Sequence, residues 1–568
     1  MTGISLEDAV RVVTTTNPVY AVGNAEIRGI DYPVFKNIPG HTRALLEAAR
    51  DVQPSEGDYL VFGDESWTYS DFTRDINRIA HALQHRFGVK KGQPVALAMR
   101  NCPEMLTLMM AITSVGGVVV FLNAWWTSEE LDYALKDSGA KLVFADQKRM
   151  ERLNPLIATH KLQLVGVRDA QCAKTYQMVL SASDNLDFPA QVIETDDDMA
   201  IMYSSGTTGH PKGVVQTHRG AMNAVYTWLM QAELAALTDP LGEDAPPPPR
   251  PAFLVVTPLF HVTATHPVFL LSLPAGAKIV LMDKWDVEEA VKLIERENIT
   301  RILGVPTQSA DLFETARRMG KSLDSLEFLG SGGAKRPAAQ VGELAEAFPN
   351  AMIATGWGMT ETNANGIGMA GPDYVARPGV AGRLYPPIQA IRFLDETGTD
   401  VPTGELGEIT VKSACNMRCY LNKPEATAEV MQDGWLRTGD LGFIDEDGII
   451  TIVDRKKNIV IRGGENIACL DVEGALHRHP AVAEACAFSV PHPRLGEVVG
   501  AGIYVQPGEA ATPEDIQTFL KEHIAHFKVP EHIWLYDTPL PRGATDKLDR
   551  RGLRAACLAQ LETTLETP

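Results

Sequence analysis

Residues 203–214 combine the residue types that hold phosphate groups, in the order YSSGTTGHPKGV. Glycines let backbone N–H groups approach an anion closely, hydroxyl groups add donors, and an ammonium neutralises charge as a compact point. The segment therefore predicts binding of a nucleotide polyphosphate. The phosphate contacts it predicts are Ser204, Ser205, Gly206, Thr207, Thr208, Gly209 and Lys212.

The spacing differs from that of P-loop nucleotidases, which need a second glycine followed by Lys and then Ser or Thr. Counting from Gly206, Pro211 stands where that second glycine belongs. Gly213 replaces the hydroxyl residue that would bind Mg²⁺. An ordinary P-loop ATPase or GTPase is therefore disfavoured.

Other segments carry matching chemistry farther along the chain. Residues 330–337, GSGGAKRP, follow an apolar run and place a glycine turn at the carboxyl end of an expected strand, where nucleotides bind in α/β sheets. Residues 356–362, GWGMTET, combine an aromatic ring that suits a purine face with a carboxylate that suits a metal ion on phosphate oxygens. The carboxylate of residues 434–440, GWLRTGD, could accept both ribose hydroxyls.

In this order, the segments resemble the adenylate-forming superfamily, in its acyl-CoA synthetase and fatty-acid–CoA ligase branch. The resemblance extends over nearly all of the chain. It implies that Trp357 packs on adenine, that Thr360 touches phosphate, and that Glu361 coordinates Mg²⁺ together with Thr207. The further ATP or AMP contacts that it implies are Gly332, Gly333, Gly356, Gly358, Asp440 and Arg455.

The resemblance also places the adenylation lysine at Lys547, within PRGATDKLDR. A mobile ammonium could stabilise negative charge between an attacking carboxylate and the α-phosphate, so Lys547, Lys212 and Glu361 are the implied catalytic residues. Two positions depart from the family pattern: Trp357 replaces the usual Tyr, and Asp546 replaces the usual Gly. Because Asp546 could pair with the lysine, a catalytically impaired ATP-binding homologue remains an alternative.

The implied reaction is ATP-dependent ligation of a carboxylic acid to CoA through an acyl adenylate, with ATP, Mg²⁺ and CoA as cofactors. The small domain would pivot about Lys457, and Gly463 and Gly464 would then line the CoA channel. His261, Gly332 and Gly366 are the expected acyl-pocket residues, and small residues near Gly366 suggest room for a medium- or long-chain fatty, aryl-alkanoic or steroid side-chain acid. A carrier protein or oxygen as the second substrate remains an alternative.

The expected fold is α/β. Apolar runs at 253–257, 278–282 and 301–305, with a helix capped by Asp286 between the last two, predict parallel strands covered by helices. We expect a large N-terminal adenylation domain at 1–454, a hinge at 455–457 and a small mobile α+β domain at 458–568 that carries the catalytic lysine. Thr512-Pro513 begins a helix in that small domain.

Composition narrows the partners. The chain has 568 residues and a net charge of −20, which disfavours binding to nucleic acid. Residues 105–122 are apolar, but Gly116-Gly117 divides them into a helix and a strand, so no transmembrane segment is expected. The cysteines are scattered and the start lacks a signal peptide, so we expect a cytoplasmic enzyme that uses small molecules; a homodimer is left open.

Overall fold

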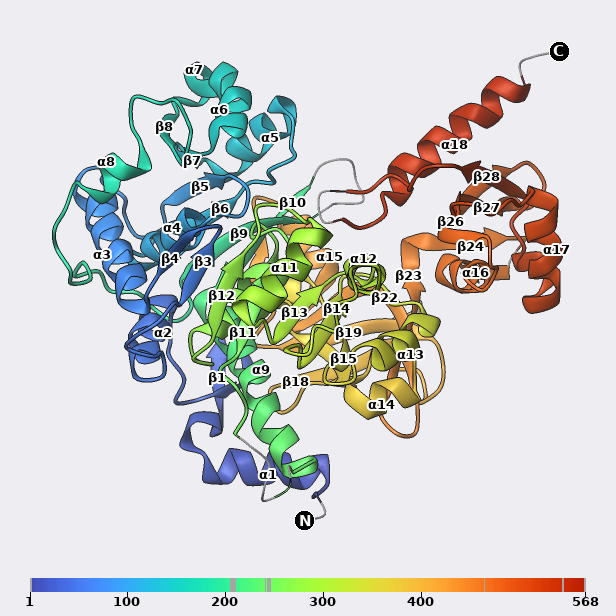
Figure 1. The fold of residues 1–568 in the computed structure, drawn as a ribbon, viewed down its shortest axis with the longest axis horizontal. Coiled ribbons are helices and arrows are strands. Elements are labelled where there is room, and N and C mark those ends of the chain that lie inside the picture. The colour runs from blue at the N-terminus through green and yellow to red at the C-terminus, as the bar shows by residue number, and fades with distance from the viewer. Residues whose placement is uncertain are drawn as a thin grey trace.

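The computed structural model describes residues 3–204, 211–240, 242, 247–463, 465–543 and 546–565. A large lobe contains most of the chain, and a smaller lobe built from the C-terminal residues stands beside it (Figure 1). Four sheets belong to the large lobe and one to the small lobe.

The first major sheet of the large lobe has seven strands, in the order β20-β10-β9-β6-β5-β7-β8. Its inner strands are parallel and consist of short buried runs such as VVVF and LVFA, as expected for strands covered on both faces. The strands are β5 (Pro94–Ala98), β6 (Val118–Phe121), β7 (Leu142–Ala145), β8 (Gln163–Gly166), β9 (Asp198–Ser204), β10 (Lys212–Thr217) and β20 (Cys419–Tyr420).

The second sheet has nine strands, in the order β17-β16-β15-β14-β13-β11-β12-β3-β4. Six of them, from β15 to β3, are parallel, and the edges are antiparallel. The strands are β3 (Leu60–Phe62), β4 (Glu65–Trp67), β11 (Ala252–Val255), β12 (Lys278–Leu281), β13 (Arg301–Gly304), β14 (Phe328–Gly332), β15 (Met352–Gly358), β16 (Gly366–Ala370) and β17 (Arg383–Leu384).

Two antiparallel sheets complete the large lobe. A hairpin of β1 (Val22–Ile27) and β2 (Ile30–Phe35) forms one of them. The other has five strands, namely β18 (Gln389–Leu394), β19 (Gly407–Ser413), β21 (Met431–Gln432), β22 (Trp435–Ile444) and β23 (Ile450–Arg455).

Helices cover both large sheets, which produces the expected α/β layering (Figure 1). Asp286 caps α11 by accepting the Glu289 N–H at 3.1 Å, as its sequence predicts. The large-lobe helices are α1 (Leu6–Thr16), α2 (Thr42–Ala48), α3 (Tyr69–His85), α4 (Pro103–Ser114), α5 (Ser128–Ser138), α6 (Gln147–Leu153), α7 (Ile157–His160), α8 (Tyr176–Leu180), α9 (His218–Thr238), α10 (Val262–Ala264), α11 (Val287–Glu297), α12 (Pro306–Met319), α13 (Ala338–Ala347), α14 (Gly371–Ala376) and α15 (Pro424–Val430).

The small lobe is an α+β unit with its own core. Apolar residues of its sheet pack against α16 and α17, and Thr512 caps α17 as predicted. Its strands are β24 (Ile459–Arg462), β25 (Glu465–Ala468), β26 (Val482–His492), β27 (Gly496–Val505) and β28 (His532–Tyr536), and its helices are α16 (Cys469–Leu476), α17 (Pro513–His523) and α18 (Arg550–Leu565).

The apolar stretch at 105–122 is buried inside the large lobe. It forms most of α4, a turn at Gly116 with a positive φ of 70°, and β6. Across the described residues, none of the helices has the length and apolar character needed to cross a membrane.

The lobes are joined by a short helical turn, Lys456–Asn458, between β23 of the large lobe and β24 of the small lobe. The buried carboxylate of Asp454, 1% exposed, ties the two sides together. It accepts the Asn458 side-chain N–H at 3.1 Å and the backbone N–H of Leu470, in α16, at 2.9 Å. A rotation of the small lobe about Lys457 stays a prediction, and it would have to break the second of these bonds.

Replacing Asp454 by Asn should therefore loosen the junction, because one acceptor oxygen and the charge that strengthens both bonds are lost. Bonds to a charged group contribute roughly 1.5–3 kcal/mol, so we expect trypsin to cut at Arg455 to Lys457 about ten times faster. Asp445→Asn is the control, since Asp445 accepts backbone N–H groups in a turn away from the junction. Equal cleavage of both variants would contradict the assignment.

Candidate active site

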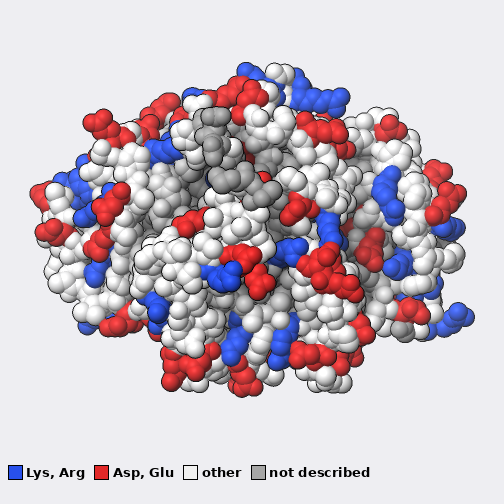
Figure 2. Space-filling model, turned by 90° about the horizontal axis from the view of Figure 1, so that it is seen from below, with Lys and Arg blue, Asp and Glu red and all other residues white. Residues whose placement is uncertain are grey.

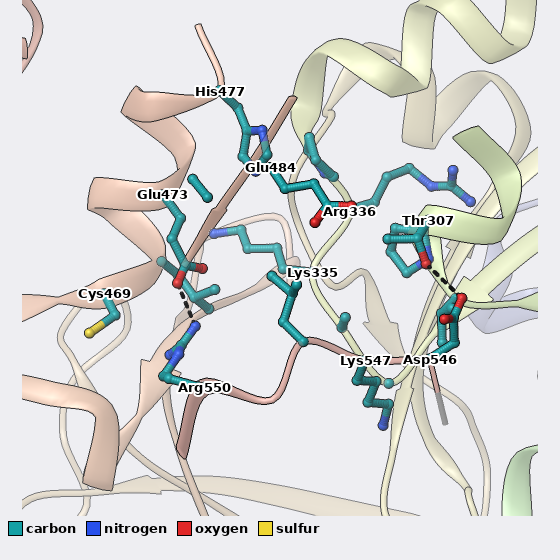
Figure 3. A pocket seen from close by; sticks show the side chains of 18 of the residues that line it. Thr307, Lys335, Arg336, Cys469, Glu473, His477, Glu484, Asp546, Lys547 and Arg550 are labelled. Atoms are coloured by element: carbon teal, nitrogen blue, oxygen red, sulfur yellow. Dashed lines mark hydrogen bonds and ion pairs between the residues drawn. The ribbon is translucent and has the colours of Figure 1, made fainter. Parts of the chain in front are cut away.

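A cavity of 1270 Å³ lies between the two lobes. Figure 3 shows its small-lobe wall, with Glu473 on α16, His477 at the C-terminal cap of that helix and Arg550 below them, on the side opposite Lys547 and Asp546. Eight of the predicted site residues line this cavity: Gly333, Gly356, Trp357, Gly358, Asp440, Arg455, Lys457 and Lys547. Segments more than 200 residues apart in the sequence thus meet in one cleft, which has room for both a nucleotide and an acid.

Two adjacent glycines lie at the carboxyl end of the nine-stranded sheet. Gly332 on β14 lies beside Gly356 on β15. A Cβ on Gly332 would lie 3.2 Å from the carbonyl oxygen of Gly356. Backbone at this edge can therefore approach a ligand closely, which is the property the glycine-rich segments predict.

Trp357 is held by a buried carboxylate. Its indole N–H donates to Asp440 Oδ2 at 2.7 Å, and Arg455 Nε lies 3.0 Å from Asp440 Oδ1. Burial raises the pKa of Asp440, and the Arg455 guanidinium opposes that rise. The Trp that replaces the family's usual Tyr therefore has a polar contact of its own, which fixes the plane of the ring next to the expected ribose residues.

Lys547 extends from the small lobe to the glycine turn of the large lobe. A Cβ on Gly333 would lie 2.5 Å from both Cε and Nζ of Lys547, so the lysine occupies the space that the glycine leaves. The side chain keeps contact with solvent in the cleft. Desolvation between the lobes, followed by the charge of Arg455, lowers the pKa of Lys547 to about 8, and Asp440 opposes that shift.

Asp546 turns away from its neighbour Lys547. Its φ of +63° is the left-handed conformation that glycine usually adopts. The carboxylate accepts from Thr307 Oγ1 at 3.5 Å and lies 3.9 Å from Arg542 Nε (Figure 3). Within the described residues no ion pair joins Asp546 to Lys547.

Glu361, the expected Mg²⁺ ligand, lies in a second cluster at the end of the seven-stranded sheet. Its Oε1 accepts from Ser204 Oγ at 3.3 Å and from the Tyr420 hydroxyl at 2.9 Å. Burial and the charge of Glu361 raise the pKa of Tyr420, so this hydroxyl stays a donor. The Lys212 ammonium lies 4.8 Å from the centre of the Tyr420 ring.

The residues around Glu361 fit a magnesium ion that is shared with a nucleotide. Among the described residues, Glu361 Oε2 receives no side-chain hydrogen bond, and no group of three His, Cys, Asp or Glu side chains could hold a metal. A cation on Glu361 would thus take its remaining ligands from phosphate oxygens and water. Mg²⁺ is usually bound in this way, through one or two carboxylates and substrate phosphates.

His261 and His266 differ in their surroundings. Burial, together with the charge of Lys547, lowers the pKa of His261 to about 3, so its ring is neutral and lies within the field of the lysine. His266 is part of a buried network, because its Nε2 contacts Asn363 Oδ1 at 2.9 Å and its Nδ1 contacts Thr265 Oγ1 at 2.9 Å. His266 therefore supports the loop after Glu361. His261 is not among the residues that line the cleft, and its place in the acyl pocket stays a prediction.

Several predicted residues lie elsewhere. Trp357 fills the room beside Gly366, where a Cβ would lie 2.8 Å from the ring, and the Tyr385 hydroxyl would lie 1.7 Å from a Cβ on Gly368. The space that these glycines leave is therefore taken by aromatic rings of the protein and not by an acid. Gly463 lies at a turn, donating its N–H to Leu495 O at 2.8 Å, outside the cleft. Thr360 begins the short helical turn Thr360–Thr362, which also contains Glu361, and its contact with phosphate stays a prediction. The other predicted residues, Ser205, Gly206, Thr207, Thr208, Gly209 and Gly464, lie outside the described residues.

Sequence reasoning missed Tyr420. Tyr420 belongs to no segment singled out above, and it reaches Glu361 only because β20 pairs with β10, where Val214 lies beside Tyr420. No predicted strand or motif includes residue 420, so the sequence carried no signal for this contact.

The surface carries no broad basic area on the face shown in Figure 2, where acidic and basic side chains are interspersed (Figure 2). Together with the net charge of −20, this means that an anionic nucleotide must be held by the local donors of the cleft.

Comparison with known proteins identifies the family. Residues 46–421 match the AMP-binding enzyme model, and residues 471–547 match the AMP-binding enzyme C-terminal domain. The chain belongs to the AMP-binding enzyme family, that is, to the adenylate-forming superfamily that its segments resemble. The predicted superfamily and the predicted α/β fold with a large and a small lobe are confirmed.

Similar proteins are acid–CoA ligases. A feruloyl-CoA synthase from Amycolatopsis sp is 33% identical over 489 residues, which cover 86% of this chain and 93% of that one. A long-chain-fatty-acid–CoA ligase from Bacillus subtilis (strain 168) is 30% identical over 529 residues, covering 87% of this chain and 90% of that one. The o-succinylbenzoate-CoA synthetase from Bacillus subtilis, in complex with its acyl-adenylate intermediate, superposes with a TM-score of 0.75 at 28% identity, covering 90% of this chain and 97% of that one.

The predicted enzyme class, an AMP-forming acid–thiol ligase, is thereby confirmed, and acid–CoA ligases of this family use ATP, Mg²⁺ and CoA.

The lowered pKa of Lys547 predicts a pH dependence of adenylation. The ammonium is present below its pKa of about 8 and is lost as the pH rises through that value. We therefore expect kcat/KM for ATP in the pyrophosphate-exchange half-reaction to fall above about pH 8, because this parameter reports the free enzyme's essential groups. Lys547→Arg should be slower but should lack this decline, since a guanidinium stays charged. A decline of the same size in that variant would assign it to another group.

The contact between Trp357 and Asp440 predicts a role in nucleotide binding. Trp357→Phe keeps a stacking face but leaves Asp440 without its indole donor. We expect KM for ATP to rise about tenfold with a smaller change in kcat, corresponding to roughly 1–1.5 kcal/mol for one lost hydrogen bond. Trp435→Phe is the control, because the Trp435 ring packs against Arg392 and lies outside the cleft. An unchanged KM for ATP in Trp357→Phe would show that the hydrogen bond between Trp357 and Asp440 does not contribute to nucleotide binding.

Proposed function

We propose that this chain activates an apolar carboxylic acid with ATP and transfers the acyl group to CoA. The acid is a medium- or long-chain fatty acid, or a bulky aryl-alkanoic or steroid side-chain acid. The observation that supports this most strongly is the meeting of Lys547 from the small lobe with Trp357 and Asp440 from the large lobe in one cleft.

In the first step, a carboxylate oxygen of the acid attacks the α-phosphorus of ATP, and pyrophosphate leaves as an acyl adenylate forms. Lys547 would neutralise charge that develops between the two anions, and Lys212 would hold the departing phosphates. Trp357, Asp440 and Arg455 would fix the adenosine, so that the α-phosphate faces the acid. Mg²⁺ bound at Glu361 supplies further neutralisation of phosphate charge when it is present.

In the second step, the thiol of CoA loses its proton to solvent and the sulfur attacks the acyl carbon. The bond between the acyl carbon and the oxygen that joins it to phosphorus breaks, and AMP leaves with that oxygen. Lys547 must withdraw for this step, because its side chain fills the space beside Gly333. We expect the small lobe to turn about Lys457, which would bring Gly463 and Gly464 toward the cleft.

The surroundings of His261 favour an apolar acid. The His261 ring is neutral, and it packs against Phe260 with ring centres 4.9 Å apart. Phe260 packs in turn against Trp125 at 5.5 Å. These aromatic rings suit alkyl or aryl groups. The Arg100 guanidinium lies over the outer ring, Trp125, at 5.2 Å, and it is already paired with Asp283 at 3.4 Å. The names of the relatives, which specify feruloyl and long-chain fatty acyl groups, agree with this class.

A substrate panel tests the proposal. Pyrophosphate release would be measured with hydroxycinnamic, aryl-alkanoic, fatty, steroid side-chain, malonic and amino acids, each with and without CoA. We expect apolar acids to be used best, with thioester formed only when CoA is present. Lys547→Ala should slow adenylation by about 10²–10³-fold, a loss typical of a removed charge-stabilising group. Lys528→Ala, which removes a lysine paired with Asp471 outside the cleft, is the control.

The same panel distinguishes the alternatives. A catalytically impaired homologue would bind ATP but release no more pyrophosphate than Lys547→Ala with any acid. An enzyme that uses oxygen would consume it without CoA, and an enzyme that serves a carrier protein would form adenylate but no CoA thioester. Preferred use of malonate or of an amino acid would contradict the apolar pocket.

A further inference from the structure

Tyr420 touches both of the groups that the proposed function assigns to phosphate charge. Its hydroxyl donates to Glu361 Oε1 at 2.9 Å, and its ring lies beneath the Lys212 ammonium at 4.8 Å. The pairing of β20 with β10 produces both contacts, because Lys212 begins β10 and Val214 lies beside Tyr420. Tyr420 is 8% exposed, so neither contact is a loose surface encounter.

The hydrogen bonds to Glu361 are one-sided. Ser204 and Tyr420 both donate to Oε1, while Oε2 receives none from the side chains that the structure describes. A carboxylate with one oxygen engaged in this way presents the other oxygen to a cation. A second cation contact, on Oε1, would have to compete with two donors that already occupy this oxygen, one of them the buried Tyr420 hydroxyl.

Divalent cations differ in how they use a carboxylate. Mg²⁺ takes near-octahedral single-oxygen contacts at roughly 2.0–2.1 Å, whereas Ca²⁺ takes more ligands at roughly 2.3–2.6 Å and commonly uses both oxygens of one carboxylate. We propose that Tyr420, assisted by Ser204, restricts Glu361 to a single-oxygen ligand and so selects Mg²⁺ over Ca²⁺. This inference rests on the proposed role of Glu361, and it makes Tyr420 a positioning residue for the cation.

The hydrogen bond from Tyr420 could also serve only to give a buried hydroxyl an acceptor, with no effect on the cation. Tyr203 provides a control for this alternative. Tyr203 is also 8% exposed and lies in β9 of the same sheet, but its hydroxyl lies 3.1 Å from each of two acceptors, Ala134 O and Asp137 Oδ2, and can donate to either. Tyr203→Phe therefore removes an equally buried hydroxyl from the same sheet without touching Glu361. Any effect found in Tyr420→Phe but absent from Tyr203→Phe belongs to the Glu361 contact.

The test measures cation binding directly and needs no turnover. Mn²⁺ would be bound to the complex of the full chain with ATP and followed by electron paramagnetic resonance, and then displaced by Mg²⁺ or by Ca²⁺. The displacement gives the ratio of the Ca²⁺ affinity to the Mg²⁺ affinity for each variant. ATP itself prefers one cation over the other, but this preference is the same in every variant, so it cancels when the affinity ratio of a variant is divided by that of the wild type. We expect Tyr420→Phe to shift this ratio toward Ca²⁺ by about tenfold, or about 1.4 kcal/mol.

Ser204→Ala, which removes the second donor, should shift the ratio in the same direction by a smaller factor. Tyr203→Phe should leave it unchanged. The inference would be overturned if Tyr420→Phe and Ser204→Ala both kept the affinity ratio of the wild type. It would also be overturned if Tyr203→Phe shifted the ratio as much as Tyr420→Phe does.

Glu361→Gln separates this inference from the proposed function. If Glu361→Gln retains wild-type Mn²⁺ binding in the ATP complex, Glu361 is not the cation ligand and the proposed role of Glu361 fails. If Glu361→Gln weakens Mn²⁺ binding but Tyr420→Phe keeps the wild-type ratio, only the assignment of Tyr420 fails.

Discussion

The contact of Lys547 with Gly333 is the interaction on which the rest of the site depends. Trp357 and Asp440, which we assign to the nucleotide, belong to the large lobe, whereas this ammonium comes from a loop of the small lobe. Gly333 leaves the space that this ammonium occupies, since a Cβ there would lie 2.5 Å from Nζ and would push the tip of the lysine aside. The lobes must therefore stay docked for the lysine to reach the cleft. The buried Asp454, which bonds to α16 across the junction, contributes to that docking.

The cleft suits anions because its buried carboxylates are paired with nearby donors, and not because of the charge of the whole chain. The net charge is −20, yet buried carboxylates in the site are each matched by nearby donors. Asp440 is paired with Arg455 and Trp357, and Glu361 with Tyr420 and Ser204. Exposed charges beyond about 10 Å are largely screened at ordinary salt, while a pair at 4 Å near a protein surface interacts by roughly 4 kcal/mol. The near groups therefore decide what the cleft binds.

Much of the fold could be predicted from the sequence, because short apolar runs alternate with amphipathic segments over most of the chain. The strands at 253–257, 278–282 and 301–305 are found as β11, β12 and β13, and 105–122 forms a buried helix and strand. Contacts created by sheet pairing could not be predicted. Tyr420 reaches Glu361 through a two-residue edge strand that binds β10 about 200 residues away in sequence. Gly366 and the small residues near it predict space for an acid, but a glycine shows only that some group approaches closely. At Gly366 and Gly368 the groups are Trp357 and Tyr385.

The departure at Asp546 has a physical explanation that preserves the lysine. The position needs a positive φ, which is why glycine suits it, and aspartate is among the few other residues that adopt this conformation readily. In that conformation the carboxylate lies toward Thr307 and Arg542, and the Arg542 guanidinium also donates to the Asp546 carbonyl at 2.9 Å. Lys547 is thus left free of an adjacent ion pair, and Asp546 links the lysine loop to α12 of the large lobe. The residue that suggested an impaired homologue instead supports the docked arrangement in which the lysine reaches the cleft.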